Sequence, residues 1–258
     1  MSTDRLPVVD PTQSNQVQRS TAEEFVQETF GEDEGEVLDP EKILKQHEAC
    51  HPGPEHHYHC MTEAHPSLRI LIGHGGEIPR WEYGSTINFA AEANGYPQQG
   101  DAEFAACHLW QAAEQWNSYD LGVRFQWVGK RKQATFILKY VDVGPKESTM
   151  AKSFFPTSRP QNTLFVYKKG LVKHRKTLKN TFLHELGHIL GLRHEFALDR
   201  EHGAVIFGLR NPKSVMSYEF PQEVQDSDID GTRRFYEYRK PSIQGLTITD
   251  YIPNQSMK

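Results

Sequence analysis

The sequence predicts an α+β fold for this chain of 258 residues. Three observations predict it: short stretches that alternate polar and apolar residues, longer segments with helical apolar spacing, and the order of the two kinds along the chain. Strand, helix, further strands, helix, loop region and helix follow one another. This order is typical of helices packed against a twisted, mixed sheet.

The expected elements can be justified in chain order. A short helix is expected at Pro40–Gln46 and a strand at Ser85–Phe89, where polar and apolar residues alternate. Glu103–Asn117 predicts a helix with one apolar stripe, formed by Ala105, Leu109, Ala112, Ala113 and Trp116. Three more strands are expected at 123–128, 135–141 and 163–167. A helix at 178–190, with Thr177 as its N-cap, and a last helix at 227–238 complete the prediction.

The chain divides into three predicted regions. Residues 1–77 form a polar, partly disordered extension and a candidate pro-segment, because they are rich in Ser, Gln and acidic residues. Residues 78–240 form the folded domain. Residues 241–258 form a tail in which Pro and Ser interrupt any regular element.

Composition restricts the classes of partner. Hydrophobic residues make up 37% of the chain, enough for a sizeable core. The net charge of −5 argues against nucleic acid. A short basic run is therefore expected to be solvated surface; it consists of Lys168, Lys169, Lys173, His174, Arg175 and Lys176. No stretch approaches 18 consecutive apolar residues, so no membrane contact is predicted.

Cysteine usage and the N-terminus bear on the compartment. Cys50, Cys60 and Cys107 cannot all pair internally and are too few for a disulfide framework. Residues 1–19 contain no hydrophobic core of a signal peptide. Taken alone, these features predict a cytoplasmic chain, or one exported by a route that the sequence does not display.

The segment 184–194 carries the strongest chemical signal. His184 and His188 are four residues apart, so on a helix both imidazoles face the same way and can share a Zn²⁺ ion. Glu185 lies about 100° round the helix, beside the metal rather than on it, where a general base belongs. Gly191 allows a left-handed turn that ends the helix, and His194 then becomes the third ligand. A fourth position stays open, as in catalytic zinc sites.

These residues resemble a known family. His184–His194 matches the signature HExxHxxGxxH of the metzincin metallopeptidases, and Ser214–Tyr218 resembles their Met-turn. The resemblance covers roughly residues 78–238. It implies a zincin-like domain with a twisted mixed sheet, a backing helix and an active-site helix, with Met216 beneath the ligands in a C-terminal subdomain. Glu195 is astacin-like and the Met-turn sequence is closest to serralysins, so the subfamily stays open.

The resemblance also implies an activity. It indicates a zinc metalloendopeptidase, a hydrolase with one catalytic Zn²⁺ that acts as a monomer on protein or peptide substrates. Glu185 would be the general base, and Tyr218 would stabilise the oxyanion, although a buried structural tyrosine is the alternative. The segment 151–155 resembles the substrate-binding edge strand. Family members are secreted, in contrast to the compartment that the cysteines suggest.

Several alternatives remain open. A zinc-dependent amidase and a non-catalytic, zinc-stabilised binding module compete with the peptidase, but a purely structural site has no use for Glu185. Glu195 either braces a processed N-terminus or is an ordinary surface carboxylate. Cys50 either latches the catalytic zinc, joins Cys60 and nearby histidines in a second metal site, or belongs to a polar loop without ligands.

Overall fold

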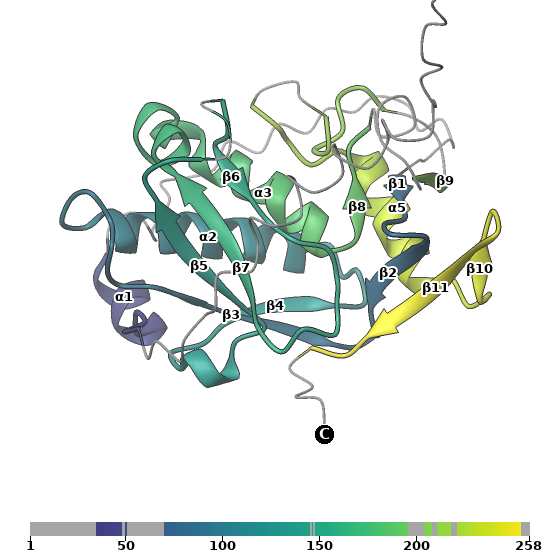
Figure 1. The fold of residues 1–258 in the computed structure, drawn as a ribbon, viewed down its shortest axis with the longest axis horizontal. Helices are drawn as coiled ribbons and strands as arrows, with labels where there is room; N and C mark the ends of the chain where they lie inside the picture. The colour runs from purple at the N-terminus through teal and green to yellow at the C-terminus, as the bar shows by residue number, and fades with distance from the viewer. Residues whose placement is uncertain are drawn as a thin grey trace, which may run out of the picture. The chain divides into compact units, whose positions relative to one another are not determined.

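The fold was analysed in a computed structural model (Figure 1). The structure describes residues 35–47, 50, 70–144, 146, 148–195, 204–207, 211–217 and 221–253. Residues 35–258 form one compact unit. It has the α+β composition that the sequence predicts, with mixed sheets and helices.

The largest sheet places an antiparallel strand at its edge. Its strands, in spatial order, are β4 (Arg124–Trp127), β3 (Thr86–Ala91), β5 (Phe136–Val141), β7 (Asn162–Tyr167) and β6 (Ala151–Lys152). β3 is parallel to β4 and β5, and β5 is parallel to β7, whereas β6 is antiparallel to β7. The edge strand expected at 151–155 is therefore present, but only two residues long. The other strands agree with the prediction to within two residues.

Two helices pack together against this sheet. They are α2 (Asp101–Asn117) and α3 (Leu178–Ile189), and Figure 1 shows both of them behind the strands. Buried aromatic side chains tie the main chain of α3 to its neighbours. Trp116 Nε1 donates to Leu183 O at 3.1 Å, and Trp81 Nε1 donates to Ile189 O at 2.7 Å. Hydrogen bonds from two tryptophans thus hold α3, the helix that carries His184 and His188, at its middle and at its end.

The helix boundaries agree closely with the sequence. α1 (Pro40–Gln46) begins after Asp39, whose carboxylate accepts from Glu41 N at 3.0 Å. α5 (Asp226–Glu237) begins one residue earlier than expected. Thr177 is the N-cap residue of α3, as predicted, but its hydroxyl donates back to His174 O and caps no helical N–H. Short 3-10 turns lie at Arg131–Gln133 and Arg175–Thr177, and a π-turn lies at Lys169–Lys173.

Two smaller sheets are made of strands that the sequence did not predict. One has the order β8 (Leu192–Arg193), β1 (Ile70–Ile72), β9 (Val205–Phe207), and all its pairs are antiparallel. The other joins the C-terminal hairpin β10 (Ser242–Ile243) and β11 (Leu246–Tyr251) to β2 (Glu77–Trp81).

The C-terminal hairpin corrects the expectation of a tail without structure. Its last strand pairs in parallel with β2, and Arg80 Nε reaches Asp250 Oδ1 at 2.5 Å. The strand was missed because Pro79 in β2 argues against a strand, and because the partner segments lie 170 residues apart. The compact unit is therefore wider than the domain predicted at residues 78–240.

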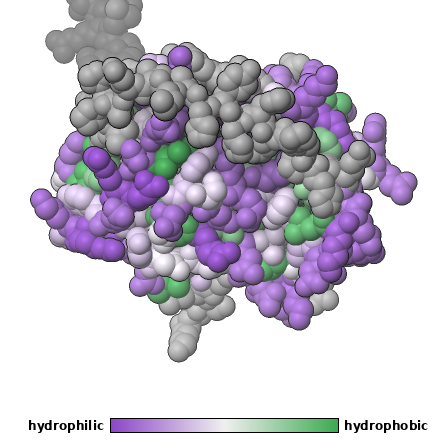
Figure 2. All heavy atoms as spheres, turned by 180° about the vertical axis from the view of Figure 1, so that it is seen from behind, coloured by the Kyte–Doolittle hydropathy of each residue, from purple (hydrophilic) through white to green (hydrophobic). Residues whose placement is uncertain are grey.

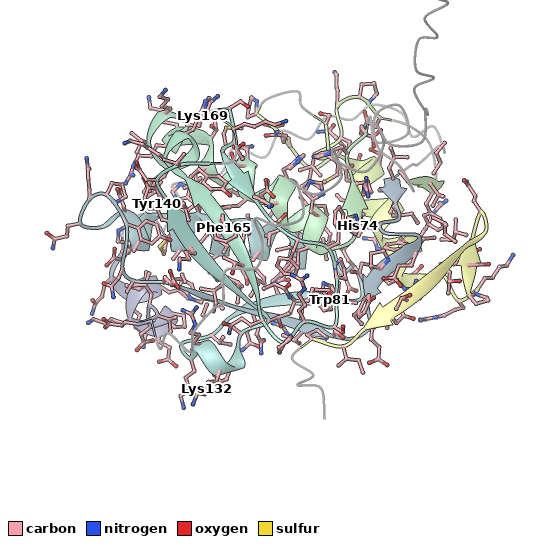
Figure 3. The ribbon with its side chains drawn as sticks, in the orientation of Figure 1. His74, Trp81, Lys132, Tyr140, Phe165 and Lys169 are labelled. Carbon is pink, nitrogen blue, oxygen red and sulfur yellow. A yellow bond between two sulfur atoms is a disulfide. The ribbon has the colours of Figure 1, made fainter. Side chains whose placement is uncertain are left out.

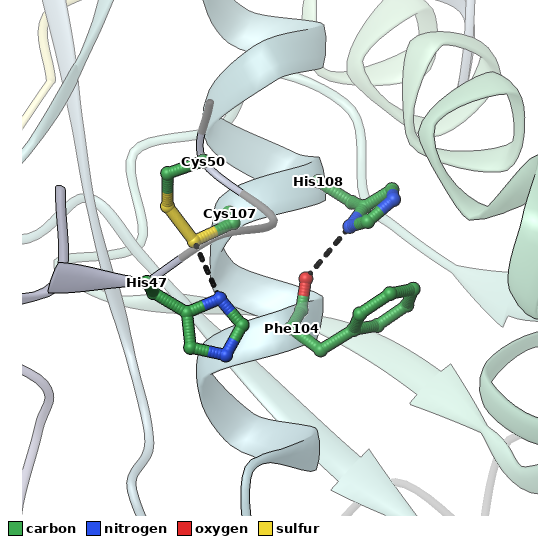
Figure 4. The surroundings of a disulfide bond; sticks show 5 residues. All are labelled: His47, Cys50, Phe104, Cys107 and His108. Atoms are coloured by element: carbon green, nitrogen blue, oxygen red, sulfur yellow. Dashed lines mark hydrogen bonds between the residues drawn. A yellow bond between two sulfur atoms is a disulfide. The ribbon is translucent and has the colours of Figure 1, made fainter. Parts of the chain in front are cut away.

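A disulfide joins Cys50 to Cys107 on α2 (Figure 4). The bond links residues 57 positions apart, and both side chains are buried. His47 Nδ1 lies 3.8 Å from Cys107 Sγ. Three cysteines are too few for a disulfide framework, but two of them form one disulfide bond, because the fold places the α1 segment against α2.

The face seen from behind is mostly hydrophilic, with small and scattered hydrophobic areas (Figure 2). Among the described residues, the large hydrophobic side chains that are exposed are Tyr83, Val143, Val172 and Ile252. Within the same part of the chain, no helix has the length and apolar character needed to cross a bilayer.

Candidate metal centre

The three motif histidines converge on one point. His184 and His188 project from α3, and His194 follows β8, with candidate ligand atoms that all lie within 4.8 Å of one another. His188 Nε2 and His194 Nε2 are 3.1 Å apart. Two imidazoles on one tetrahedral Zn²⁺ would hold their nitrogens about 3.3 Å apart, given Zn–N distances of about 2.0–2.1 Å. The three residues can therefore hold a metal ion.

Main-chain carbonyls orient two of the rings. His184 Nδ1 lies 2.8 Å from Val215 O, and His188 Nδ1 lies 2.8 Å from Leu192 O. Since a carbonyl only accepts, Nδ1 carries the proton in both rings, and Nε2 keeps its lone pair for a metal. Outer hydrogen bonds of this kind fix the tautomer and the direction of metal-binding imidazoles.

Burial keeps the centre of the cluster neutral. It holds the pKa of His188 well below its ordinary value, and the neighbouring His184 and His194 lower the pKa further. A neutral imidazole is the form that binds a metal. His188 is thus in the form that can bind a metal at neutral pH.

Glycines set how closely the surrounding chain approaches. Gly191 has φ +94°, and a Cβ at this position would lie 2.7 Å from Pro79 O. This confirms the left-handed turn predicted after the helix. Gly187 lies between the two helical ligands, and a Cβ there would collide with Met216 Sδ. Met216 is 1% exposed and therefore packs against the ligand-bearing turn of α3.

Glu185 is buried beside the histidines. It is 8% exposed, and its Oε2 accepts a hydrogen bond of 2.6 Å from Ser153 Oγ, just beyond β6. Burial raises the pKa of Glu185, while His184 and the hydrogen bonds from Ser153 oppose that rise. The edge strand and the carboxylate are thus physically linked, which sequence reasoning missed because a serine next to a strand carries no signal.

A cavity of about 970 Å³ opens over this group. Its lining includes the three histidines, Glu185 and the edge strand, so the cluster faces open space rather than a closed core. Phe155 also lines the cavity, with its ring 5.4 Å from that of His188 and stacked on His74 at 4.5 Å. Neither Phe155 nor His74 was singled out from the sequence.

A buried carboxylate braces the turn that carries Met216. Asp228 of α5 is fully buried; its Oδ1 accepts from Ser214 Oγ at 2.6 Å, and its Oδ2 accepts from Val215 N at 2.8 Å and from Gln225 N at 2.9 Å. Val215 is also the residue whose carbonyl orients His184. The helix, the turn and the metal ligand therefore form one connected network.

The remaining candidate residues have different outcomes. Glu195 is 5% exposed, and its Oε2 accepts from Asn211 N at 3.3 Å, so the alternative of an ordinary surface carboxylate is wrong. Cys50 is bonded to Cys107 and offers no thiolate to latch a metal or to build a second site. Tyr218 lies outside the described residues, as do Cys60 and the histidines at 51, 56, 57 and 59.

No protein-family model matches the sequence, and no curated protein matches it. Any conclusion about function therefore rests on the chain's own residues and their arrangement.

Proposed function

We propose that the chain is a zinc-dependent endopeptidase with a metzincin-like, zincin-type catalytic domain. The observation that carries the proposal is the convergence of three imidazoles beside a buried carboxylate in an open cleft. Met216 beneath the ligand helix, and the left-handed turn at Gly191 before the third ligand, support the metzincin resemblance.

The donor set favours zinc. Three imidazole nitrogens suit a borderline-soft divalent ion, and a cleft on the remaining side leaves a coordination position open. A bound zinc ion supplies a water with a pKa of about 7 and polarises the scissile carbonyl.

Glu185 moves the proton. Its carboxylate accepts a proton from the attacking water as the oxygen bonds to the carbonyl carbon, and returns it to the amine as the C–N bond breaks. Burial raises the pKa of the Glu185 carboxyl. The raised pKa lies closer to those of the attacking water and the leaving amine, between which Glu185 transfers the proton. Ser153 holds the carboxylate in place through its hydroxyl.

The edge strand supports a peptide as substrate. Among the described strands, β6 pairs only with β7, so its other side can bind an extended chain through main-chain hydrogen bonds. Ser153 follows directly, so a peptide bound along β6 runs past Glu185. This arrangement favours a protein or peptide substrate over a small amide.

Digestion of casein and of a peptide library tests the proposal with three samples: zinc-loaded wild type, chelator-treated wild type and zinc-loaded Glu185→Ala. We expect cleavage by the first sample only. Loss of the general base should lower kcat/KM by at least about 10²-fold.

One outcome separates the peptidase from the non-catalytic alternative. If zinc-loaded wild type cleaves nothing while binding one zinc, the chain is a zinc-stabilised binding module. In that case Glu185→Ala should leave zinc binding unchanged and have no activity to lose.

A further inference from the structure

The cleft is basic although the chain is acidic overall. Lys146, Lys152 and Lys169 line it, and none of them forms an ion pair with a described residue. Glu185 is the one carboxylate among the described lining residues, and the net charge of the whole chain is −5. A concave surface of one sign concentrates the field and attracts ligands of the opposite sign.

Part of this charge comes from the basic run that the sequence assigned to solvated surface. The π-turn and the 3-10 turn before α3 bring Lys169 and His174 to the cavity, while Lys168 points to Asp142, 3.3 Å away. In Figure 3, Lys169 and His74 lie well apart, and both line the cavity. The basic run is therefore divided between solvent and the cleft.

Two buried polar side chains line the same cavity. Thr181, one turn before His184 on α3, is 3% exposed, and Gln222 is 6% exposed. Gln222 Oε1 is buried and has no hydrogen-bond partner among the described residues. Rotation of the amide exchanges its oxygen and nitrogen, so Gln222 can present N–H donors to an anion. A cavity wall with an unsatisfied buried amide fits a polar ligand better than an apolar side chain.

We infer that the cleft selects substrates with an acidic side chain, Asp or Glu, next to the scissile bond. The lysines supply the attraction, and the side-chain amide of Gln222 supplies a short-range hydrogen bond to the carboxylate. This inference rests on the proposed peptidase function and names its substrate class. A free C-terminal carboxylate has the same chemistry and is distinguished by the experiment.

Binding to zinc-loaded Glu185→Ala tests the inference without turnover. The probes are fluorescein-labelled octapeptides with capped ends that differ only at two central positions, Glu-Glu or Gln-Gln. A third probe is the Gln-Gln peptide with a free C-terminus. By anisotropy at physiological ionic strength, we expect the Glu-Glu peptide to bind about tenfold more tightly than both Gln-Gln peptides, with the advantage shrinking at high salt.

Charge reversal assigns the effect to the cleft. In the same background, Lys146→Glu with Lys169→Glu should remove the preference for Glu-Glu. The matched control is Lys130→Glu with Lys132→Glu, which makes the same change in net charge at exposed sites outside the cavity lining (Lys132 is labelled in Figure 3). The control should retain the preference, and both variants should melt at the temperature of the parent.

Three results would overturn the inference: equal binding of the capped peptides, tighter binding of the free C-terminus alone, or an equal loss in the control variant. Cleavage by wild type is scored separately. If neither peptide is cleaved but the Glu-Glu preference persists, the peptidase proposal fails and the acidic subsite stands. If both are cleaved at equal kcat/KM and bind equally, only the subsite fails.

Discussion

Contact between Met216 and Gly187 sets how close the C-terminal part of the chain lies to the metal ligands. Gly187 directly precedes His188 on the helix, and the thioether of Met216 fills the space that a side chain would occupy there. Glycine in a helix interior costs roughly 1 kcal/mol relative to alanine. Its presence here is therefore explained by the approach of Met216 rather than by helix stability.

Gly187→Ala tests that contact. The new methyl group must displace Met216, and overpacking of this kind costs about 1–3 kcal/mol, more than the gain in helix propensity. We expect a lower free energy of unfolding in urea and weaker zinc binding. Met216→Ala in the same chain opens space and should recover part of the loss, as a double-mutant cycle would measure. A stabilised Gly187→Ala protein would contradict the contact.

His108 is expected to make stability depend on pH. Burial lowers its pKa, the hydrogen bond of its Nδ1 with Phe104 O opposes this, and the charge of Arg175 lowers it further (Figure 4). The unfolded chain therefore binds protons more readily than the folded one. The contribution of neutral His108 to the free energy of unfolding is complete above its ordinary pKa of 6.5. It is lost as the pH falls toward the lower pKa of the folded state.

His108→Gln removes this titration and keeps an N–H donor. The difference in unfolding free energy between wild type and variant should shrink as the pH falls from about 7.5 to about 5.5. Urea unfolding of both proteins without metal, at several pH values, measures it. The other histidines cancel in the comparison, and a difference that stays constant with pH would show that His108 is not responsible.

At the scale of elements, α5 acts on the metal site through the turn 214–217. Asp228 satisfies two main-chain N–H groups and one hydroxyl, and one of those groups belongs to the residue whose carbonyl orients His184. The first turn of α5 favours a carboxylate because the helix dipole is positive there. The buried side chain of Asp228 thus stabilises the start of α5, the turn 214–217 and the orientation of His184 together.

Asp228→Ala should weaken zinc binding by about 10–100-fold, the usual effect of losing an outer partner of a metal ligand. It leaves buried N–H groups unsatisfied, so stability should fall by several kcal/mol as well, at about 1–3 kcal/mol per group. Competition with a chromophoric chelator measures the affinity. Asp226→Ala is the matched control, with the same charge change on an exposed residue of the same helix turn. Equal effects in both variants would argue against the network.

At the scale of the whole unit, the disulfide connects the N-terminal part to the scaffold of the site. It anchors the α1 segment to α2, which packs directly on α3. Val37 also pairs with Glu92 at the end of β3. Residues before the predicted catalytic region are therefore part of the fold. Disulfides persist mainly in oxidising compartments, which accords with the secretion that the family resemblance implies.

Cys107→Ser should lower the free energy of unfolding by about 4 kcal/mol, the loop-closure value for a bridge of this span. Urea unfolding measures it, and reductant added to wild type should have the same effect. Cys60→Ser removes a thiol without breaking the bridge and should change little. Because the bond is remote from the ligand set, zinc affinity of the folded variant should stay near that of wild type. Unchanged stability without the bridge would contradict this role.

The sequence by itself determined the local features. Helical spacing of His184 and His188, the left-handed turn at Gly191 and the apolar stripe of α2 all depend on residues close together in the chain. Short-range periodicity and turn chemistry are sufficient for such features. For this reason the helices and the central strands agree with the prediction, and the three histidines that could hold a metal ion were named without a structure.

Only the tertiary structure decided which distant residues reach the site. Ser153 contacts Glu185, Asp228 braces the turn at Val215, and β11 pairs with β2 across most of the chain. These contacts join segments whose composition carries no sign of one another, and a serine, an aspartate or a short strand has many possible partners. The division of the basic run between solvent and cleft has the same cause. The sequence shows which chemical groups the side chains carry, but packing determines which of those side chains become neighbours.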